Sequence, residues 1–190
     1  TEESNQIVFN AIEYVAPEDE PEEPAENTVA FGDGEFVFAP GETDTVTMNT
    51  SADDVAGFEV FVDFDPEYVQ VEDIEAADLD GTLVTDIDNE NGTFAAALAQ
   101  ANGEDAPDML DVEITFTGEY GDMTDLMFDA DSALFASDGE IDADFEDATL
   151  TAGQLGDVNN DGEITAFDAI LIQQYIAGQE PTDDFYPALA

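Results

Sequence analysis

The sequence predicts a mainly β protein, a jelly-roll or β-sandwich of about nine strands, with a detached strand before it and one loop-plus-helix unit after it. Three observations support this fold class. Short apolar runs with period-2 alternation recur from residue 29 to residue 151, turn-forming residues separate them, and only residues 165–177 show helical spacing. We therefore divide the chain into residues 1–15, 16–28, 29–152 and 153–190.

The N-terminal segment contains an apolar, β-prone run at residues 5–15. Its side chains alternate between two apolar faces, with Ile7, Phe9 and Ala11 on one face and Val8, Ile12 and Tyr14 on the other. Such a pattern is typical of a strand that is covered on both sides. Residues 16–28 combine prolines with like charges, which favour an extended spacer. We predict a strand held away from the sandwich; the alternatives are a disordered leader and a first strand of the same sandwich.

Residues 29–152 contain the predicted sandwich. Turn signals such as Pro40-Gly41, Asp80-Gly81 and Asn91-Gly92 separate its apolar runs. The expected strands are residues 35–39, 43–49, 57–64, 68–74, 82–87, 93–98, 111–117, 126–130, 133–135 and 140–145. Many short strands at close spacing are typical of sandwiches and jelly rolls.

Two asparagines match the acceptor pattern for N-glycosylation. They are Asn49, in Asn-Thr-Ser, and Asn91, in Asn-Gly-Thr, and both fall near strand ends or turns. The pattern is short and common, so unmodified asparagines are an equally good interpretation.

A loop near the C-terminus has the ligand spacing of an EF-hand-like calcium loop. Oxygen-bearing side chains occupy its positions 1, 3 and 5, and Gly162 at position 6 permits the sharp turn. A backbone carbonyl fills position 7, a bridging water is common at position 9, and a carboxylate closes the shell at position 12. The predicted ligands are Asp157, Asn159, Asp161, the carbonyl of Glu163, Thr165 and Asp168. The alternative is a solvated turn rich in Asp, Asn and Gly.

The loop leads directly into the predicted helix, whose Phe167, Ile170, Leu171, Gln174 and Tyr175 share one face, and Gly178 is placed as its stop. The string GDVNNDGEITAFDAILIQQYIAG closely resembles one type I dockerin repeat. The resemblance implies calcium binding and docking onto a cohesin. Dockerins usually carry two such repeats, whereas this chain has one, and Ala166 and Phe167 occupy positions that usually help to read the cohesin.

The sandwich region carries a second resemblance. The segment GFEVFVDFDPEYVQVEDIEAADL and the later DGEIDADFEDATLTAG look like the cohesin and carbohydrate-binding-module superfamily of secreted jelly rolls. This resemblance covers residues 30–152 and implies a cohesin-like sandwich. It fixes the fold better than the ligand.

The charge of the chain is one-sided. The chain has 190 residues, of which 50 are Asp or Glu and none is Lys, Arg or His, so its formal net charge is -50. A chain without basic side chains cannot neutralise phosphates, which excludes binding to nucleic acid and to anionic membrane surfaces. The composition resembles that of haloarchaeal secreted proteins, and the self-repulsion predicts a need for salt.

The missing residue types also limit catalysis. Without His, Cys, Lys or Arg, the chain has no triad base, thiolate, Schiff-base amine or guanidinium clamp. A pair of carboxylates, as in glycosidases, is the chemistry that remains. We predict that the protein is not an enzyme.

Two functions fit these features. The first is a structural subunit of an extracellular, calcium-stabilised filament or surface assembly, in which identical subunits polymerise by donating their N-terminal strands. The second is a dockerin/cohesin-type binding module for protein scaffolding, with a cohesin-like partner, or for glycan binding. Sugar platforms favour Trp, which is absent, so the first function ranks above the second.

Overall fold

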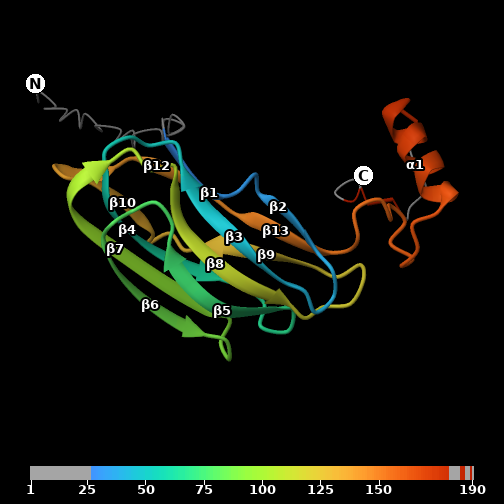
Figure 1. Ribbon diagram of the computed structural model, residues 1–190, viewed down its shortest axis with the longest axis horizontal. Helices are drawn as coiled ribbons and strands as arrows, with labels where there is room; N and C mark the ends of the chain where they lie inside the picture. The colour runs from blue at the N-terminus through green and yellow to red at the C-terminus, as the bar shows by residue number, and fades with distance from the viewer. Residues whose placement is uncertain (1–26, 180–184, 187–188, 190) are drawn as a thin grey trace, which may run out of the picture.

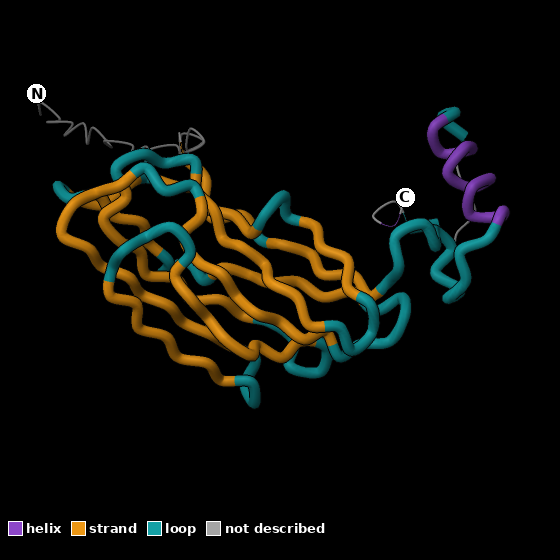
Figure 2. The backbone as a smooth tube through the Cα atoms, viewed as in Figure 1, coloured by secondary structure: helices purple, strands orange, loops and turns teal. Residues whose placement is uncertain are grey.

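The structure is a computed structural model that describes residues 27–179, 185–186 and 189 (Figures 1 and 2). The predicted donor strand at residues 1–15 lies outside this range, and so does most of the spacer at 16–28. The sandwich begins at Asn27, two residues before its predicted start. The mainly β prediction is confirmed: the described residues form thirteen strands in two sheets and one helix.

The first sheet has five strands in the order β12-β1-β3-β8-β5. Their bounds are β12 Ala143–Glu146, β1 Asn27–Phe31, β3 Thr43–Thr50, β8 Asp108–Phe116 and β5 Val69–Ala76. All its pairings are antiparallel except β1 with β12.

The second sheet has eight strands. Six follow the order β11-β10-β4-β9-β13-β2, with bounds Gly139–Ile141, Ala133–Ala136, Val55–Asp63, Met123–Phe128, Ala148–Ala152 and Glu35–Phe38. The remaining two extend the sheet from β4, because β7 (Thr93–Glu104) pairs with β4 and β6 (Thr82–Asp88) pairs with β7. Strands β6, β11 and β2 are therefore edges of this sheet.

The chain passes from the first sheet to the second several times, and two of these crossings, between β1 and β2 and between β12 and β13, are short. The two crossings lie side by side, since β1 pairs in parallel with β12 and β2 pairs in parallel with β13. Gly32 and Gly34, with φ of 50° and 86°, form the first crossing in the left-handed region that glycine adopts easily. Each crossing splits one long run into two short strands.

These crossings explain where the strand prediction was incomplete. The predicted strand 140–145 is divided into β11 and β12, and the alanine- and threonine-rich β13 was missed. β1 was missed because it follows the acidic spacer directly. The other nine predicted strands are present, with β7 extended to Glu104.

Alternating apolar residues of both sheets fill the core. Phe31, Phe58, Phe94 and Phe116 are buried there. The ring of Phe31 stacks on that of Phe128 with centroids 5.1 Å apart. Each buried Phe contributes about 1.5–3 kcal/mol relative to an exposed one. The strand β1 supplies Val29 and Phe31 to this core.

Candidate metal centre

The predicted calcium loop leaves the end of β13 and leads into helix α1 (Ala166–Ile176), beyond one end of the sandwich (Figure 1). Three of its residues adopt positive φ: Gly156 at 96°, Asn160 at 52° and Gly162 at 87°. Gly162 thus occupies the sharp turn that the sequence predicted. Asn160 is tolerated because Asn adopts the left-handed region more easily than most residues.

Asp157 is the buried centre of the loop, with no exposed surface. Its Oδ1 accepts a hydrogen bond from the N–H of Asp161 at 3.1 Å, and its Oδ2 accepts one from the N–H of Gly162 at 2.7 Å. The loop backbone therefore wraps around this carboxylate. Loop position 1 has the environment expected of a residue that organises the turn.

Asp168 is the second buried carboxylate, 1% exposed, in the first turn of α1. Its Oδ2 accepts from the N–H and the Oγ1 of Thr165, and its Oδ1 accepts from the N–H of Val158. Thr165 in turn caps the helix by accepting from the N–H of Phe167. The Thr165 N–H holds the pKa of Asp168 below its ordinary value of 3.8, although burial acts in the opposite direction.

The remaining predicted ligands are less enclosed. Asp161 is exposed; its Oδ2 accepts from the side-chain amide of Asn159 at 2.6 Å, and its Oδ1 accepts from the N–H of Glu163. The side chains of Glu163 and Thr165 are also exposed. Within residues 27–179, 185–186 and 189, no three acidic side chains converge as a metal-binding group. The structure thus joins the predicted ligands through hydrogen bonds within one loop.

Two observations show that the loop fits a cation. The Oδ1 of Asn159 is buried and has no hydrogen-bond partner, which is costly for a buried acceptor. Asp157 and Asp168 are buried negative charges in a chain that contains no basic side chain to pair with them. Carboxylate and amide oxygens are the ligands that calcium prefers. A hard cation at the loop would satisfy all three groups.

Residues 155–188 match the family model of the dockerin type I domain. Type I dockerin domains are calcium-binding, EF-hand-like modules, so the calcium prediction is confirmed for this part of the chain. The matched range contains residues 156–178, whose sequence resembles a dockerin repeat, and continues to residue 188. We call residues 155–188 the dockerin unit.

Solved cohesin structures share the fold of the sandwich. A non-cellulosomal cohesin from Archaeoglobus fulgidus has a TM-score of 0.55 and 16% identity, covering 66% of this chain and 90% of that chain. The seventh ScaB type I cohesin from Pseudobacteroides cellulosolvens gives 0.57 and 14%, covering 67% and 92%. A chain of a type I cohesin–dockerin complex from Clostridium thermocellum gives 0.58 and 10%, covering 66% and 98%. No curated protein matches in sequence. At these identities the likeness shows a cohesin-like jelly-roll fold.

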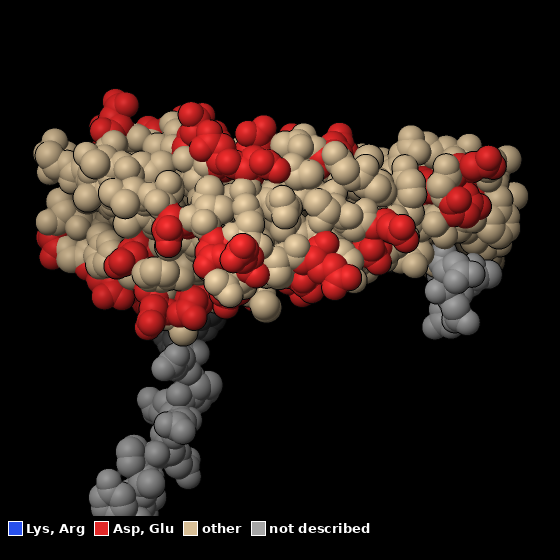
Figure 3. All heavy atoms as spheres, turned by 90° about the horizontal axis from the view of Figure 1, so that it is seen from below, with Lys and Arg blue, Asp and Glu red and all other residues tan. Residues whose placement is uncertain are grey.

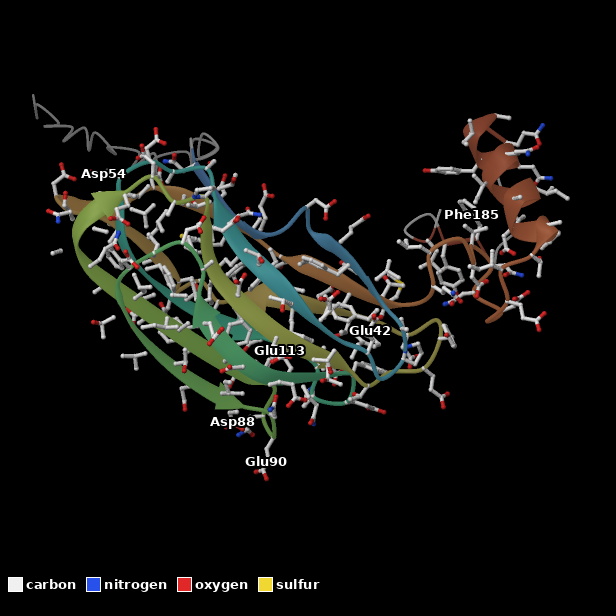
Figure 4. The ribbon with its side chains drawn as sticks, in the orientation of Figure 1. Glu42, Asp54, Asp88, Glu90, Glu113 and Phe185 are labelled. Atoms are coloured by element: carbon white, nitrogen blue, oxygen red, sulfur yellow. The ribbon has the colours of Figure 1, made fainter. Side chains whose placement is uncertain are left out.

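A small core of its own holds the dockerin unit together. Val158, Leu171 and Leu189 are buried against one another, and the ring of Phe185 packs on that of Tyr175 with centroids 5.0 Å apart (Figure 4). The chain end returns to the loop, since the N–H of Gly156 donates to the carbonyl of Leu189 at 2.7 Å. The tail residues Phe185, Tyr186 and Leu189 thus pack at this small core.

The side-chain amide of Asn160 connects this unit to the sandwich. Its Nδ2 donates to the carbonyl of Ala152, the last residue of β13, at 3.2 Å. Val37 of β2 also packs against the small core. The sequence analysis missed Asn160, because loop position 4 carries no ligand in the calcium-loop pattern.

Helix α1 buries less than its sequence predicted. Leu171 is 1% exposed, but Phe167 and Ile170, which were expected on the same buried face, are 51% and 49% exposed. Ile164, at loop position 8, is 56% exposed, whereas its apolar side chain suggested an inward orientation. Among the described residues the helix faces one small core, which does not cover these side chains.

The two glycosylation candidates have different environments. Asn49 lies half-buried in β3, and its Nδ2 donates to the carbonyl of Gly32 at 3.1 Å. Asn91 is exposed in the turn between β6 and β7, and its Nδ2 donates to Asp88 at 2.7 Å. Exposure in a turn makes Asn91 the more accessible acceptor of the two.

Among the described residues, no helix combines the length and apolarity needed to cross a membrane.

Proposed function

We propose that the chain is a non-catalytic, extracellular scaffold module that binds a protein partner through its dockerin unit when calcium fills the loop. Cohesin and dockerin modules are protein-binding scaffold modules. The absence of His, Cys, Lys and Arg supports a non-enzymatic role. An extracellular location is supported by the setting typical of cohesin–dockerin proteins.

We propose Asp157, Asn159, Asp161, Asp168 and the Glu163 carbonyl as the calcium ligands, with Thr165 acting through a water. Calcium would supply positive charge to the two buried carboxylates and to the unpaired Asn159 oxygen. The chain itself holds these groups: Thr165 orients Asp168 at the helix start, and the loop N–H groups orient Asp157. Metal binding would therefore fix the start of α1.

The observation that carries this proposal is the surface of α1. The helix has one charged residue, Asp168, and that residue is buried at the loop. Every exposed side chain of the helix is uncharged, in a chain where 26% of residues are charged. Large exposed side chains such as Phe167, Ile170 and Ile176 form an apolar patch, and such patches typically mark an interaction site. A protein partner is the simplest surface to cover it.

The test combines calorimetry, hydrogen exchange and binding assays. Calcium should bind at one site, slow amide exchange in α1, and allow binding to at least one immobilised type I cohesin module in molar salt. Asp157→Ala should abolish all three effects, whereas Glu163→Gln should preserve them, because only the backbone carbonyl of Glu163 is a proposed ligand. Partner binding that persists in a chelator would contradict the proposal.

A second candidate is the filament subunit that polymerises through strand donation. The two-faced apolar pattern of residues 7–14 and the stiff spacer after it support this candidate. Edge strands such as β5, β6 and β12 are positions where an added strand could pair. In both candidates the chain consists of four separate units, at residues 1–15, 16–28, 29–152 and 153–190.

A further inference from the structure

The outer face of α1 is an extended uncharged surface. Tyr175 is exposed but packs on Phe185; the other exposed residues of the helix are Ala166, Phe167, Ala169, Ile170, Gln173 and Ile176, which we call the docking face. Ile176 is 78% exposed. On the face seen in Figure 3, groups of acidic side chains are separated by broad uncharged stretches. None of the residues of the docking face is charged.

A second surface, low in charge, is the outer side of the sheet formed by β10, β4, β7 and β6. Buried and half-exposed residues alternate along β7, so Ala95, Ala97 and Ala99 point outward. Strand pairing places Phe135, Gly57, Ala99 and Thr82 in one row, Ala133, Glu59, Ala97 and Val84 in the next, and Phe61, Ala95 and Asp86 in a third. We call these three rows the alanine face. Its charged residues are Glu59 in the middle row and Asp86, which lies on the edge strand β6 at the border of the third row.

The alanine face is concave and apolar. A hollow of about 430 Å³ lies over it, lined by Val84, Ala97, Ala99 and Phe135 among others, with Glu59 as the only charged lining residue. Val84 is 66% exposed, which is unusual for a Val in a strand. Exposed apolar patches bordered by polar residues mark interaction sites.

The outer side of the other sheet is different. Asp73 lies opposite Glu113, and Glu75 lies opposite Asp111, on the neighbouring strands β5 and β8. Like charges opposite one another destabilise a sheet, so this side follows the acidic character of the whole chain. The low charge of the alanine face is therefore a local property.

We infer that the docking face of one molecule binds the alanine face of a second copy of this chain. The inference rests on the proposed function, because it names the partner of the dockerin unit. Within one molecule the two faces cannot meet. Helix α1 lies beyond one end of the sandwich, whereas β10, β7 and β6 extend toward the other end, and the small core fixes α1 in place (Figures 1 and 4).

Charge favours a second copy seated in this way. The chain has no basic residue, so two copies can approach closely only where both surfaces are nearly uncharged. The docking face and the alanine face meet this condition, and one contact covers both. The acids at the border of the alanine face, such as Asp63 and Asp86, would disfavour a shifted register.

Shape and size also match. The docking face presents bulky Phe167, Ile170 and Ile176, while the alanine face presents small side chains that leave room for them. An 11-residue helix is about 16 Å long. The three rows and four strands of the alanine face span roughly 14 Å in each direction. One helix therefore covers the face.

Such a contact joins two different surfaces and does not close by itself, so it produces open chains of molecules. Calcium would control assembly, because the loop holds the start of α1.

The test uses two full-length variants: Ile170→Asp places a charge on the docking face, and Ala97→Asp places one on the alanine face. Gln70→Asp, exposed on the acidic sheet, is the control.

Sedimentation velocity in molar salt with calcium should show the unchanged protein and the Gln70→Asp variant as chains that grow with concentration. A chelator should return both to monomers. Each of the other two variants alone should be monomeric, with self-affinity reduced at least about tenfold. Their equimolar mixture should stop at dimers, because it retains one intact pair of faces.

Several outcomes would overturn the inference. Dimers of Ala97→Asp alone would indicate helix-to-helix pairing, and chains formed by both variants would indicate another interface. An unchanged protein that stays monomeric but binds a cohesin module in calcium would remove this inference and leave the proposed function intact. Loss of cohesin binding as well would remove both.

A cross-linking experiment guards against variants that misfold. The chain has no cysteine, so single introduced thiols report only on the designed contact. Ala97→Cys and Ile170→Cys chains, mixed under mild oxidation, should form a disulfide between the two different chains in calcium and not in a chelator. If the Ala97→Cys homodimer and the Ile170→Cys homodimer formed in the same yield as the mixed disulfide, the result would contradict the head-to-tail contact.

Discussion

Asp157 and Asp168 are the residues on which the C-terminal unit depends. Both are buried, both accept loop N–H groups, and neither has a basic partner anywhere in the chain. In most proteins a buried carboxylate is paired with Lys or Arg. Here the remaining compensation is a set of hydrogen bonds and a cation. Calcium affinity and local stability should therefore change together.

Replacing Asp157 with Ala should lower calcium affinity by more than about tenfold and lower the melting temperature in calcium. The variant loses a proposed ligand and leaves the N–H groups of Asp161 and Gly162 without their acceptor. Calorimetry and thermal melts measure the two effects. Unchanged calcium binding in this variant would show that the ligand assignment is wrong.

Asp88 offers a residue-scale test of the sandwich. The side-chain amide of Asn91 holds the pKa of Asp88 below its ordinary value of 3.8. A lowered folded-state pKa stabilises the fold above the ordinary value, and this contribution is lost as the pH falls through the folded-state pKa. In Asn91→Ala, an NMR titration should show the Asp88 pKa moving upward. Asn49→Ala should leave it unchanged.

At the scale of elements, α1 depends on its surroundings. An isolated helix of 11 residues is marginal in water. The helix is held by its Thr165 cap, by the loop, and by Leu171 in the small core. Its outer face contributes nothing to the stability of a single molecule, which is consistent with a role in binding.

Leu171→Ala should destabilise the dockerin unit by about 2–4 kcal/mol, because it leaves a cavity beside Val158 and Leu189. Ile176→Ala, at a position that is 78% exposed, should change the stability of the monomer by less than about 0.5 kcal/mol. Hydrogen exchange of the α1 amides distinguishes the two variants. Equal effects would contradict the assigned orientation of the helix.

The local patterns in the sequence were sufficient for most elements. The helix was predicted at residues 165–177 and occurs at Ala166–Ile176, with Thr165 as cap and Gly178 at a φ of 71°. Period-2 alternation identified strands such as β4 and β8, since one side of each faces the core. The strand β1 was missed because it directly follows the acidic spacer, and β13 was missed because it is rich in alanine and threonine.

Burial in the dockerin unit was harder to predict than its ligand pattern. The ligand spacing follows from local loop geometry, so the sequence contains it. The exposure of Ile164, Phe167 and Ile170 depends on how much neighbouring surface exists. Helical periodicity identifies an apolar face but does not show whether this chain or another molecule covers it. For the same reason, strand alternation alone did not reveal the alanine face.

At the scale of the whole molecule, charge sets the conditions for folding. Fifty acidic residues without a basic partner repel one another, and the screening length falls from about 10 Å at 0.1 M salt to about 3 Å at 1 M. We expect a cooperative melt and a strong β signal in circular dichroism only with molar monovalent salt or millimolar divalent ions. A native-like melt in dilute, calcium-free buffer would contradict this expectation.

Deleting residues 1–15 separates the two routes of assembly. Helix docking uses the docking face and the alanine face, which both lie after residue 27, so the deleted chain should retain its calcium-dependent assembly. Strand donation requires residues 6–15. If it is the route of assembly, the chain without residues 1–15 should be a folded, calcium-binding monomer. The control replaces residues 1–15 with a Gly, Ser and Glu segment of equal length, which keeps the charge and removes both apolar faces. Sedimentation of the three proteins with calcium and with a chelator gives the answer. Loss of assembly in both altered chains would favour strand donation and count against helix docking, because the docking surfaces remain intact in each.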